Sequence, residues 1–309
     1  MKHSPLPSVI KSFAKLNLYL QVLNKRKDNF HNLSTLFVRI GLSDTIILKK
    51  RQDSLIRIKC DSRQVPKDKT NLCFRAAELL KQELKLGYGL EIEIKKRIPV
   101  GAGLGGGSSN AASVLLGLNK YWQLNLSKVK LISLASKLGC DVPFFIHDTR
   151  FALGSQRGDK IKPLTFLEKI KPWFILVYPS VKVSTPLIYQ KFDLYLSGKQ
   201  AGRYSNRSIS ELTRQQCNVK ILLSELLKNG SCIDPGCLFN DLEVITSSLY
   251  PAVNRVKDAL FALGLDKVMM SGSGPAVFGI CNCRTQAQKL SNQLRRKHKS
   301  WKVFSSSAV

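Results

Sequence analysis

Five glycines fall between Val100 and Ser108, in the segment IPVGAGLGGGSSNAAS. Glycine loses more conformational freedom on folding than any other residue, so a dense cluster indicates a backbone that turns tightly or lies against another group. The preceding residues, LEIEIKKRIPV, alternate as a strand does. The following residues, NAASVLLGLNKYW, are apolar at helical spacing, with Ser108 and Ser109 available as caps. The sequence therefore predicts a strand, a glycine loop and a helix, in that order.

A glycine loop that leads into a helix is a typical anion-binding site, because backbone N–H groups collect at the positive end of the helix dipole. The hydroxyl groups of Ser108 and Ser109 can add bonds to a phosphate or to a Mg²⁺ ion. The segment lacks the Gly-Lys-Ser/Thr ending of the Walker loop, and its surroundings do not match the dinucleotide-binding fingerprint. We expect a phosphate-binding loop of another kind, with a purely structural turn as the alternative.

The apolar pattern extends over the whole chain. A length of 309 residues with 44% hydrophobic composition allows one large or two medium domains, and we expect two closely packed lobes, residues 1–160 and 161–309. The polar segment 198–208 indicates a surface loop. The other expected elements are strands at 9–23 and 35–50, a helix after Asn71, a strand at 90–100, helices at 110–122 and about 127–138, a turn at 139–145, a strand at 173–180, helices near 218–228 and 251–263, a strand, loop and strand over 268–283, a helix at 285–298 and a strand at 300–307.

The net charge is strongly positive, because 49 Lys and Arg residues stand against 21 Asp and Glu residues, which gives +28. Such a charge attracts polyanions, including nucleic acid, and it also favours an anionic substrate. The basic residues are spread along the chain in short clusters without an aromatic-rich RNA-binding motif. We therefore expect a solvated basic surface and no nucleic-acid partner.

Composition also bears on compartment and metals. No stretch approaches the roughly 18 consecutive apolar residues of a membrane span, and the first residues, MKHSPLPSVIKSFAK, lack the apolar core of a signal peptide. The eight cysteines are scattered without a Cys-x-x-Cys pair. We expect a cytoplasmic protein with no membrane partner, disulfide framework or zinc site. The sequence indicates neither the oligomeric state nor any metal ligand.

Several segments together resemble one known family. PVGAGLGGGSSNAA is similar to the ATP-binding signature of the GHMP kinases. Seven further segments follow that family's order between about residues 11 and 280: SFAKLNLYL, DNFHNLSTLF, NLCFRAAELL, LGCDVPFF, VSTPLIY, NDLE and MSGSGPAVFG. The resemblance implies a two-lobed α+β fold with an N-terminal lobe of a ribosomal-protein type. It also implies ATP on that lobe, the acceptor between the lobes, and Mg²⁺ with the nucleotide.

Phosphoryl transfer to an alcohol needs a base for the acceptor hydroxyl and positive charge near the transferred group. The resemblance makes Asp141 the catalytic aspartate and candidate base, and Lys15 the catalytic lysine between Asp141 and the hydroxyl. Asn17, on the same strand face as Lys15, resembles the family's acceptor-binding asparagine. Taken alone, Asp141 could be a turn or cap residue and Lys15 a surface lysine, although Lys15 lies in an otherwise apolar strand.

The resemblance also implies a set of ATP-binding residues. Lys96 among them has an alternative as a solvated strand residue. The SGSGP segment, residues 271–275, is either a second glycine turn near the phosphates or a plain β-turn. For NDLE, residues 240–243, a helix cap is an adequate explanation. The ATP-binding positions are Asn71, Leu72, Lys96, Gly101, Gly103, Leu104, Gly105, Gly106, Gly107, Ser108, Ser109 and Asn110.

Within this family, the form GLGGGSSNAA is similar to that of kinases that phosphorylate the 2-hydroxyl of an acceptor with a cytidine diphosphate head, in isoprenoid precursor biosynthesis. A pyrimidine needs flat aromatic faces and hydrogen bonds at its edge. The resemblance implies that the rings of Phe30 and Tyr189 hold the base and that His31 reads its edge. It also implies that Phe37 and Thr185 line the site.

The chain departs from the family at one point: where the family has Asp-Gly-Tyr-His, it has Asp28-Asn29-Phe30-His31. Phe30 keeps the stacking face without the hydroxyl, and Asn29 adopts a left-handed turn more readily than most residues. Two other functions stay open. One is a GHMP kinase of homoserine or mevalonate type, whose acceptor site would lack the paired rings. The other is a catalytically inactive, basic nucleic-acid-binding protein.

Overall fold

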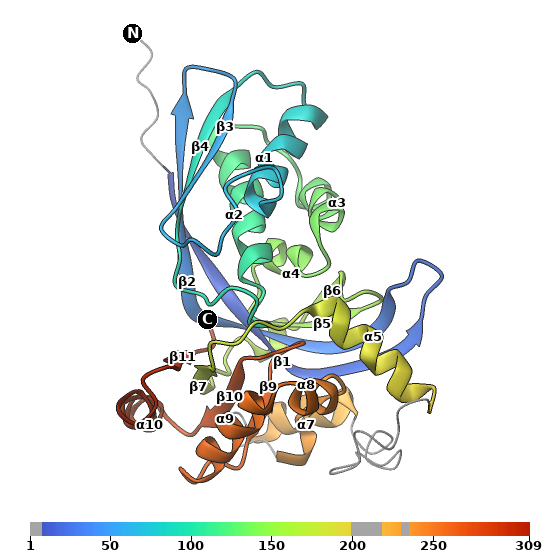
Figure 1. Cartoon of the computed structure of the whole chain (residues 1–309). Coiled ribbons are helices and arrows are strands. Elements are labelled where there is room, and N and C mark those ends of the chain that lie inside the picture. Colours follow the sequence, from blue (N-terminus) through green and yellow to red (C-terminus); the bar gives the residue numbers. More distant parts are fainter. Residues whose placement is uncertain (1–7, 199–217, 230–234) are drawn as a thin grey trace.

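Two β-sheets, each covered by helices, make up the described part of the protein (Figure 1). The computed structural model describes residues 8–198, 218–229 and 235–309, so the loop expected at 198–208 lies outside the described residues apart from Gly198. Among the described residues, no helix combines the length and the apolar character needed to cross a bilayer.

The larger sheet is built around a long antiparallel pair, β1 (Ser8–Lys25) and β2 (His31–Arg51). Both expected strands of this region are therefore confirmed, and both are longer than expected. One strand from the second half of the chain joins β1, and β6 crosses the lobe boundary proposed at residue 160. The strand order is β3 (Ile56–Cys60), β4 (Gly89–Lys95), β2, β1 and β8 (Phe239–Asn240), while β5 (Phe151–Ser155) pairs with β2 and with β6 (Lys160–Pro163).

The middle of β1 is buried on both faces, which explains its nearly continuous apolar run. Ala14, Leu16 and Leu18 pack into a core that the two sheets share. Side chains of a strand alternate between its faces, so the residues between them lie on the other face. Those residues are Lys15 and Asn17, and both are buried. The strand therefore carries two polar side chains into the interior of the molecule.

Four helices cover the upper part of the larger sheet (Figure 1). Asn71 caps the first by accepting a hydrogen bond from the N–H of Cys73, and Ser127 caps the third by accepting one from the N–H of Lys130. Their apolar faces pack on Ile46 and other residues of the sheet. The helices are α1 (Leu72–Glu83), α2 (Gly106–Tyr121), α3 (Lys128–Leu138) and α4 (Val142–His147).

Two expectations for this region are wrong. Helix α2 begins at Gly106, with the left-handed Gly105 as its N-cap residue and no side-chain cap, so Ser108 and Ser109 lie inside the first turn. Segment 139–145 is more than a turn, because α4 starts within it, and proline is tolerated in the first turn of a helix. In addition, the strand expected at 90–100 already ends at Lys95.

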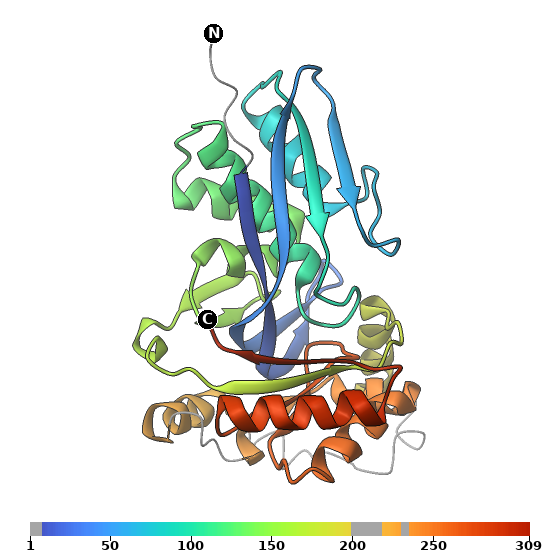
Figure 2. The same ribbon diagram turned by 90° about the vertical axis from the view of Figure 1, so that its left-hand side faces the viewer.

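The smaller sheet is antiparallel and lies in the lower part of the molecule (Figure 1). Its order is β11 (Lys302–Ser307), β7 (Trp173–Tyr178), β10 (Val277–Cys281) and β9 (Val268–Met270). Helix α10 (Arg284–Lys297) lies along β7 and β11 (Figure 2). The other helices among the described residues of this half are α5 (Thr185–Leu196), α7 (Val219–Asn229), α8 (Glu243–Leu249) and α9 (Pro251–Phe261), with 3₁₀ turns at Thr165–Leu167 and Pro235–Cys237.

The expected strands and helices of this half are confirmed, namely β7, β9, β10, β11, α7, α9 and α10. The sequence did not predict six further elements: the short strands β3, β5, β6 and β8, and the helices α5 and α8. Of these, α5 matters most for function, because it forms one wall of the cavity described next.

Candidate active site

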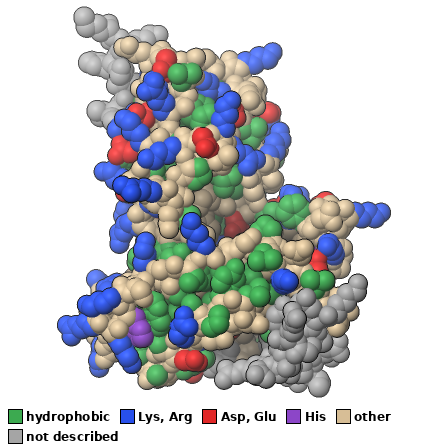
Figure 3. Space-filling model, in the orientation of Figure 1, with side chains coloured by type: hydrophobic (Ala, Val, Ile, Leu, Met, Phe, Trp, Pro, Cys, Tyr) green, Lys and Arg blue, Asp and Glu red, His purple; other side chains and the backbone are tan. Residues whose placement is uncertain are grey.

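A cavity of about 850 Å³ opens where the upper and lower parts of the molecule meet, and Figure 3 shows the surface hollowed there. Its walls come from β1, β2, the start of α1, the glycine loop, the residue before α4, α5 and the SGSGP turn. Every site residue predicted from the sequence lines this cavity except Ser109. Residues that are far apart in the sequence are thus brought together in one place.

The glycine loop leads directly into α2. Gly103 and Gly105 have φ angles of 77° and 67°, in the left-handed region that favours glycine. Gly106, Gly107 and Ser108 line the cavity, and the first N–H groups of a helix have no intrahelical partner. The first turn of α2 has no acidic residue. The loop therefore presents N–H donors and the positive end of a helix dipole to the cavity, as the anion-binding interpretation requires.

The SGSGP turn supports the glycine loop from below. The hydroxyl of Ser271 donates to the carbonyl of Gly103 at 3.2 Å, and the N–H of Ala276 donates to the carbonyl of Ala102 at 3.2 Å. A Cβ atom on Gly103 would lie 2.1 Å from the carbonyl oxygen of Ser271, so only glycine fits there. The turn is more than a plain connection, because it packs on the glycine loop and contributes Ser273 to the cavity wall.

The NDLE segment holds the SGSGP turn in place. The amide nitrogen of Asn240 donates to the carbonyls of Met270 and Gly272 at 2.8 and 2.9 Å. The carboxylate of Asp241 accepts a hydrogen bond from the N–H of Val22 at 2.7 Å. The expected helix cap is wrong, because no side chain caps α8. The segment instead connects the turn to the long strand β1.

Asp44 of β2, which is fully buried, organises the residues on both sides of the glycine loop. One carboxylate oxygen accepts the N–H groups of Arg97 and Ile98 at 2.7 and 2.8 Å. The other accepts hydrogen bonds from Nζ of Lys96 and from Nδ2 of Asn110. Lys96 is therefore not a solvated strand residue, since its side chain is 8% exposed and ion-paired. Sequence reasoning missed Asp44, whose only signal was an acidic residue within an apolar strand.

Two other predicted nucleotide positions have structural partners. The hydroxyl of Ser109 lies 2.7 Å from that of Ser12, in the buried layer between α2 and β1. The amide oxygen of Asn71 caps α1, and its nitrogen donates to the carbonyl of Pro66 at 2.6 Å. Leu72 and Asn71 nevertheless line the cavity beside the glycine loop.

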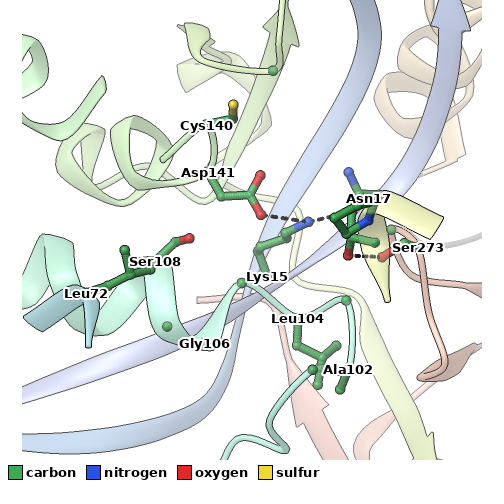
Figure 4. A pocket seen from close by; sticks show the side chains of 18 of the residues that line it. Lys15, Asn17, Leu72, Ala102, Leu104, Gly106, Ser108, Cys140, Asp141 and Ser273 are labelled. Carbon is green, nitrogen blue, oxygen red and sulfur yellow. Dashed lines mark hydrogen bonds and ion pairs between the residues drawn. The ribbon is translucent and has the colours of Figure 1, made fainter. Parts of the chain in front are cut away.

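Lys15 and Asp141 lie side by side at the centre of the cavity (Figure 4). Nζ of Lys15 is 3.4 Å from Oδ2 of Asp141 and donates to Oδ1 of Asn17 at 2.7 Å. Asn17 in turn donates to the hydroxyl of Thr35 at 2.8 Å. Nζ also lies 5.1 Å from the centroid of the Phe37 ring. Lys15 is therefore held from several sides, and it is not a surface lysine.

The side chain of Asp141 faces the cavity rather than its own helix. It precedes α4 but makes no capping hydrogen bond, which removes the interpretation as a helix cap. Burial raises the pKa of the neighbouring Cys140 thiol to about 11, so this thiol stays protonated at neutral pH. A carboxylate beside a buried ammonium, next to an anion-binding loop, can accept the proton of an alcohol.

Aromatic residues gather at the other end of the cavity. The ring of Tyr189 stacks on that of His31, with centroids 5.2 Å apart and an interplanar angle of 23°. Phe30 is 49% exposed, and the guanidinium of Arg157 lies 5.3 Å from its ring centroid. Asn29 has a φ of 64°, the left-handed conformation that its residue type favours. Phe30 and Tyr189 therefore line the same end of the cavity, where Phe30 contacts Arg157 and Tyr189 contacts His31.

Thr185, at the start of α5, lies between these two ends. Its hydroxyl is 2.7 Å from that of Ser273 in the SGSGP turn. Helix α5 and the glycine-loop support are thus joined by a hydrogen bond between two cavity residues. The cavity runs from the glycine loop, past Lys15 and Asp141, to the rings of Tyr189 and Phe30.

The donor groups fit a nucleoside triphosphate, because N–H groups, Lys15 and Lys96 all surround the glycine loop. The described residues contain no group of three or more side chains that could together hold a metal. Mg²⁺ in kinases is bound by one or two protein oxygens, by water and by the substrate phosphates, so such a group is not required. Beside the loop, the cavity offers the Ser108 hydroxyl and the Asp141 carboxylate as oxygen ligands (Figure 4).

Comparison with known proteins agrees with this geometry. The GHMP kinases N terminal domain matches residues 71–149, and the GHMP kinases C terminal domain matches residues 220–300. The 4-diphosphocytidyl-2-C-methyl-D-erythritol kinase of Syntrophus aciditrophicus (strain SB) is 38% identical over 296 residues, covering 96% of this chain and 97% of the relative. The protein of the same name from Gloeothece citriformis (strain PCC 7424) is 37% identical over 286 residues, covering 91% and 89%.

A solved structure is similar over nearly the whole chain. The crystal structure of a 4-(cytidine 5'-diphospho)-2C-methyl-D-erythritol kinase matches with a TM-score of 0.76 and 30% identity. The match covers 97% of this chain and 98% of that one. The similarity therefore includes both sheets and the cavity between them.

Proposed function

Because this chain belongs to the 4-diphosphocytidyl-2-C-methyl-D-erythritol kinases, which are GHMP kinases of α+β fold, we propose that it phosphorylates the 2-hydroxyl of 4-diphosphocytidyl-2-C-methyl-D-erythritol. ATP is the phosphoryl donor, and the reaction belongs to non-mevalonate isoprenoid precursor biosynthesis. One observation carries the proposal: an anion-binding helix start, a carboxylate–ammonium pair and an aromatic wall share one cavity.

Asp141 acts as the base in this proposal. As the acceptor oxygen attacks the γ-phosphorus, its proton passes to the carboxylate of Asp141, and the terminal phosphoryl group leaves the β-phosphate oxygen. The ammonium of Lys15, 3.4 Å from that carboxylate, stabilises negative charge on the acceptor oxygen and on the transferred group. Asn17 keeps the ammonium in place through its 2.7 Å hydrogen bond.

The glycine loop binds the triphosphate in this proposal. The N–H groups at the start of α2 bond to phosphate oxygens, and Asn71 and Leu72 lie where the adenine would sit. The Ser108 hydroxyl would help the phosphates to hold Mg²⁺, whose charge would balance that of the phosphate oxygens. Lys96 keeps a positive charge beside the loop because Asp44 fixes its position.

The acceptor lies across the rest of the cavity, with its cytosine ring at Phe30, His31 and Tyr189. The exposed Phe30 ring and the Tyr189 ring supply faces for the base, while Phe37 and Thr185 line the path toward Lys15. These rings favour a cytidylated acceptor over homoserine or mevalonate, because neither of those molecules has an aromatic group to stack.

An ADP-release assay tests this choice of acceptor. The enzyme with MgATP should release ADP in the presence of 4-diphosphocytidyl-2-C-methyl-D-erythritol and not with homoserine, mevalonate or no acceptor. Turnover with homoserine or mevalonate alone would retain the kinase and reject this acceptor.

In the proposed function, the net charge of +28 does not serve to bind a nucleic acid. On the face drawn in Figure 3, Lys and Arg side chains are distributed over both parts of the molecule rather than gathered in one patch. An inactive nucleic-acid-binding protein would instead bind RNA with strong salt dependence and show no ATP turnover. An RNA titration at physiological salt, run beside the ADP-release assay, separates the two functions.

A further inference from the structure

Helix α5 places three residues along one face of the cavity. Thr185, Tyr189 and Asp193 are spaced four residues apart, so they lie above one another on the helix, and all three line the cavity. The first two are predicted acceptor-site residues. Asp193 was not predicted, and the proposed reaction gives it no role.

Asp193 contacts the edge of His31 while Tyr189 covers the face of the same ring. Oδ1 of Asp193 is 2.6 Å from Nε2 of His31, and the Tyr189 ring lies 5.2 Å away, nearly parallel to the imidazole. The imidazole is buried, with 6% of its side chain exposed. One helix therefore fixes both the plane of the His31 ring and its rotation within that plane.

The second oxygen of Asp193 is also occupied, since it accepts a hydrogen bond from Nζ of Lys25 at 2.7 Å. Burial pushes the pKa of Asp193 upward, but the hydrogen bonds from Lys25 and His31 outweigh it and hold the pKa below its usual value. Asp193 is therefore an ionised carboxylate at neutral pH, and a carboxylate can only accept hydrogen bonds.

The proton on the His31 ring follows from this. Because Asp193 accepts, Nε2 of His31 must carry a hydrogen, and in a neutral imidazole the other nitrogen, Nδ1, is then an acceptor. Within the described part of the chain, Nδ1 of His31 has no hydrogen-bond partner. It is left for a ligand in the cavity that His31 lines.

We propose that Asp193 is a positioning residue that holds His31 in the Nε2–H form, so that Nδ1 selects a base with an amino group at its edge. Cytosine carries an amino group where uracil carries a carbonyl oxygen. An acceptor nitrogen bonds to the first and is repelled by the second. The inference rests on the proposed function for the identity of the ligand, and on the geometry of α5 for the form of His31.

The substitution Asp193→Asn tests this inference. Lys25 donates to one oxygen, so the amide oxygen of the asparagine turns toward Lys25 and its NH₂ group faces Nε2 of His31. Nε2 must then accept, the proton moves to Nδ1, and the edge offered to the base changes from acceptor to donor. The side chain of Asp193 is 27% exposed, so the helix tolerates the change. Asp53→Asn is the control, because it removes one carboxylate that pairs with a basic side chain, away from the cavity.

Two measurements apply to each variant: the ¹⁵N shifts of the His31 ring, and calorimetric titration with CDP and with UDP. The wild type and Asp53→Asn should show Nε2–H and should bind CDP at least about tenfold more tightly than UDP. Asp193→Asn should show Nδ1–H and should lose about tenfold or more of that preference, with the ATP KM and the unfolding midpoint little changed. A merely structural role would not move the tautomer or the ratio.

An Nδ1–H form in the wild type, or an unchanged CDP-to-UDP ratio in Asp193→Asn, would overturn the inference. Failure of the proposed function gives a different result, because the wild type would then bind neither nucleotide. In that case the tautomer alone decides whether Asp193 orients His31, with Nε2–H in the wild type and Nδ1–H in Asp193→Asn as the supporting result.

Discussion

The two ends of the cavity present different chemical groups to its interior, backbone groups at one end and side chains at the other. At the glycine-loop end, the phosphate end of the proposed function, backbone N–H groups face the cavity, and buried hydrogen bonds of Asp44 and Ser271 hold the nearby backbone. At the end with Phe30, His31 and Tyr189, the base end of the proposed function, side chains face the cavity, and one of them, Phe30, is half exposed. A backbone site depends on the conformation of its loop, whereas a side-chain site depends on a few separate groups.

This difference determines how each end responds to mutation. A substitution at the phosphate end acts through the shape of the glycine loop, so it changes stability and nucleotide binding together. A substitution at the base end removes one contact and leaves the others, so it changes acceptor binding alone. The residues between the two ends, Lys15 and Asp141, should affect the rate rather than either affinity.

The largest effect should come from Lys15→Met, which keeps the length of the buried side chain and removes its charge. Loss of a preorganised positive group should lower kcat by about 10²–10³-fold, with smaller changes in KM for ATP and acceptor. Steady-state kinetics with each substrate varied in turn measure this. Equal loss in kcat and in ATP binding would instead place Lys15 in the nucleotide site alone.

The next largest effect is expected from Asp44, which holds the residues beside the glycine loop. Asp44→Asn leaves the ammonium of Lys96 without its buried counter-charge, and breaking such a pair should cost about 3–5 kcal/mol of unfolding free energy. KM for ATP should rise while CDP affinity stays close to that of the wild type. Urea unfolding and the two ligand titrations measure these quantities.

Glu93→Gln is the matched control for Asp44→Asn. It also removes a carboxylate that pairs with a lysine, Lys49, but this pair lies at the surface. Its effect on unfolding should be much smaller. Equal losses of unfolding free energy in the two variants would show that Asp44 does not stabilise the loop more than a surface carboxylate does.

A smaller effect on unfolding free energy should distinguish a glycine that close packing requires from one that is needed only for its backbone conformation. Gly103 and Gly101 both have positive φ angles, but an added Cβ meets the Ser271 carbonyl at 2.1 Å in the first case and nothing within 4 Å in the second. Gly103→Ala should therefore be destabilising by about 1–3 kcal/mol more than Gly101→Ala. Paired urea unfolding curves measure the difference, and indistinguishable curves would contradict the close packing of the two loops.

The smallest effect concerns the exposed ring at the base end. Phe30→Leu removes one stacking face and should raise the acceptor KM by about fivefold, with the ATP KM unchanged. Phe30→Tyr, which restores the hydroxyl usual in the family, should stay within about twofold of the wild type. Kinetics with the acceptor varied measure both, and a larger change in ATP KM than in acceptor KM would remove Phe30 from the acceptor site.

Much of the fold could be predicted because its signals are local. The alternation around β1 and β2, the Asn71 cap and the apolar spacing of α3 and α10 each lie within a short stretch of sequence. The start of α2 was misplaced because Gly105 is its N-cap residue through a left-handed backbone conformation. Ser108 and Ser109, in contrast, are residue types that usually cap a helix with their side chains. Helix α5 was missed because only Ile188 and Phe192 along it are buried, which leaves a weak apolar pattern.

The same contrast explains the site. The phosphate end could be predicted in outline because its glycines are clustered in one short stretch of sequence, and a family resemblance supplied Lys15, Asp141 and the base-end residues. Asp44 and Asp193 were not predicted, because each acts through partners far away in the sequence. Asp44 reaches Arg97 and Asn110, and Asp193 reaches His31. Only the folded chain shows those contacts.

We propose that Asp141, which lies between the two ends of the cavity, accepts the proton of the acceptor hydroxyl. The most direct test is a single-turnover measurement of phosphoryl transfer from MgATP to 4-diphosphocytidyl-2-C-methyl-D-erythritol in the wild type and in Asp141→Asn, with both ligands saturating. If Asp141 is this base, the rate should be at least about 10²-fold lower in the variant, with ATP and acceptor still bound. A folded Asp141→Asn protein that transfers the phosphoryl group at nearly the wild-type rate would contradict it.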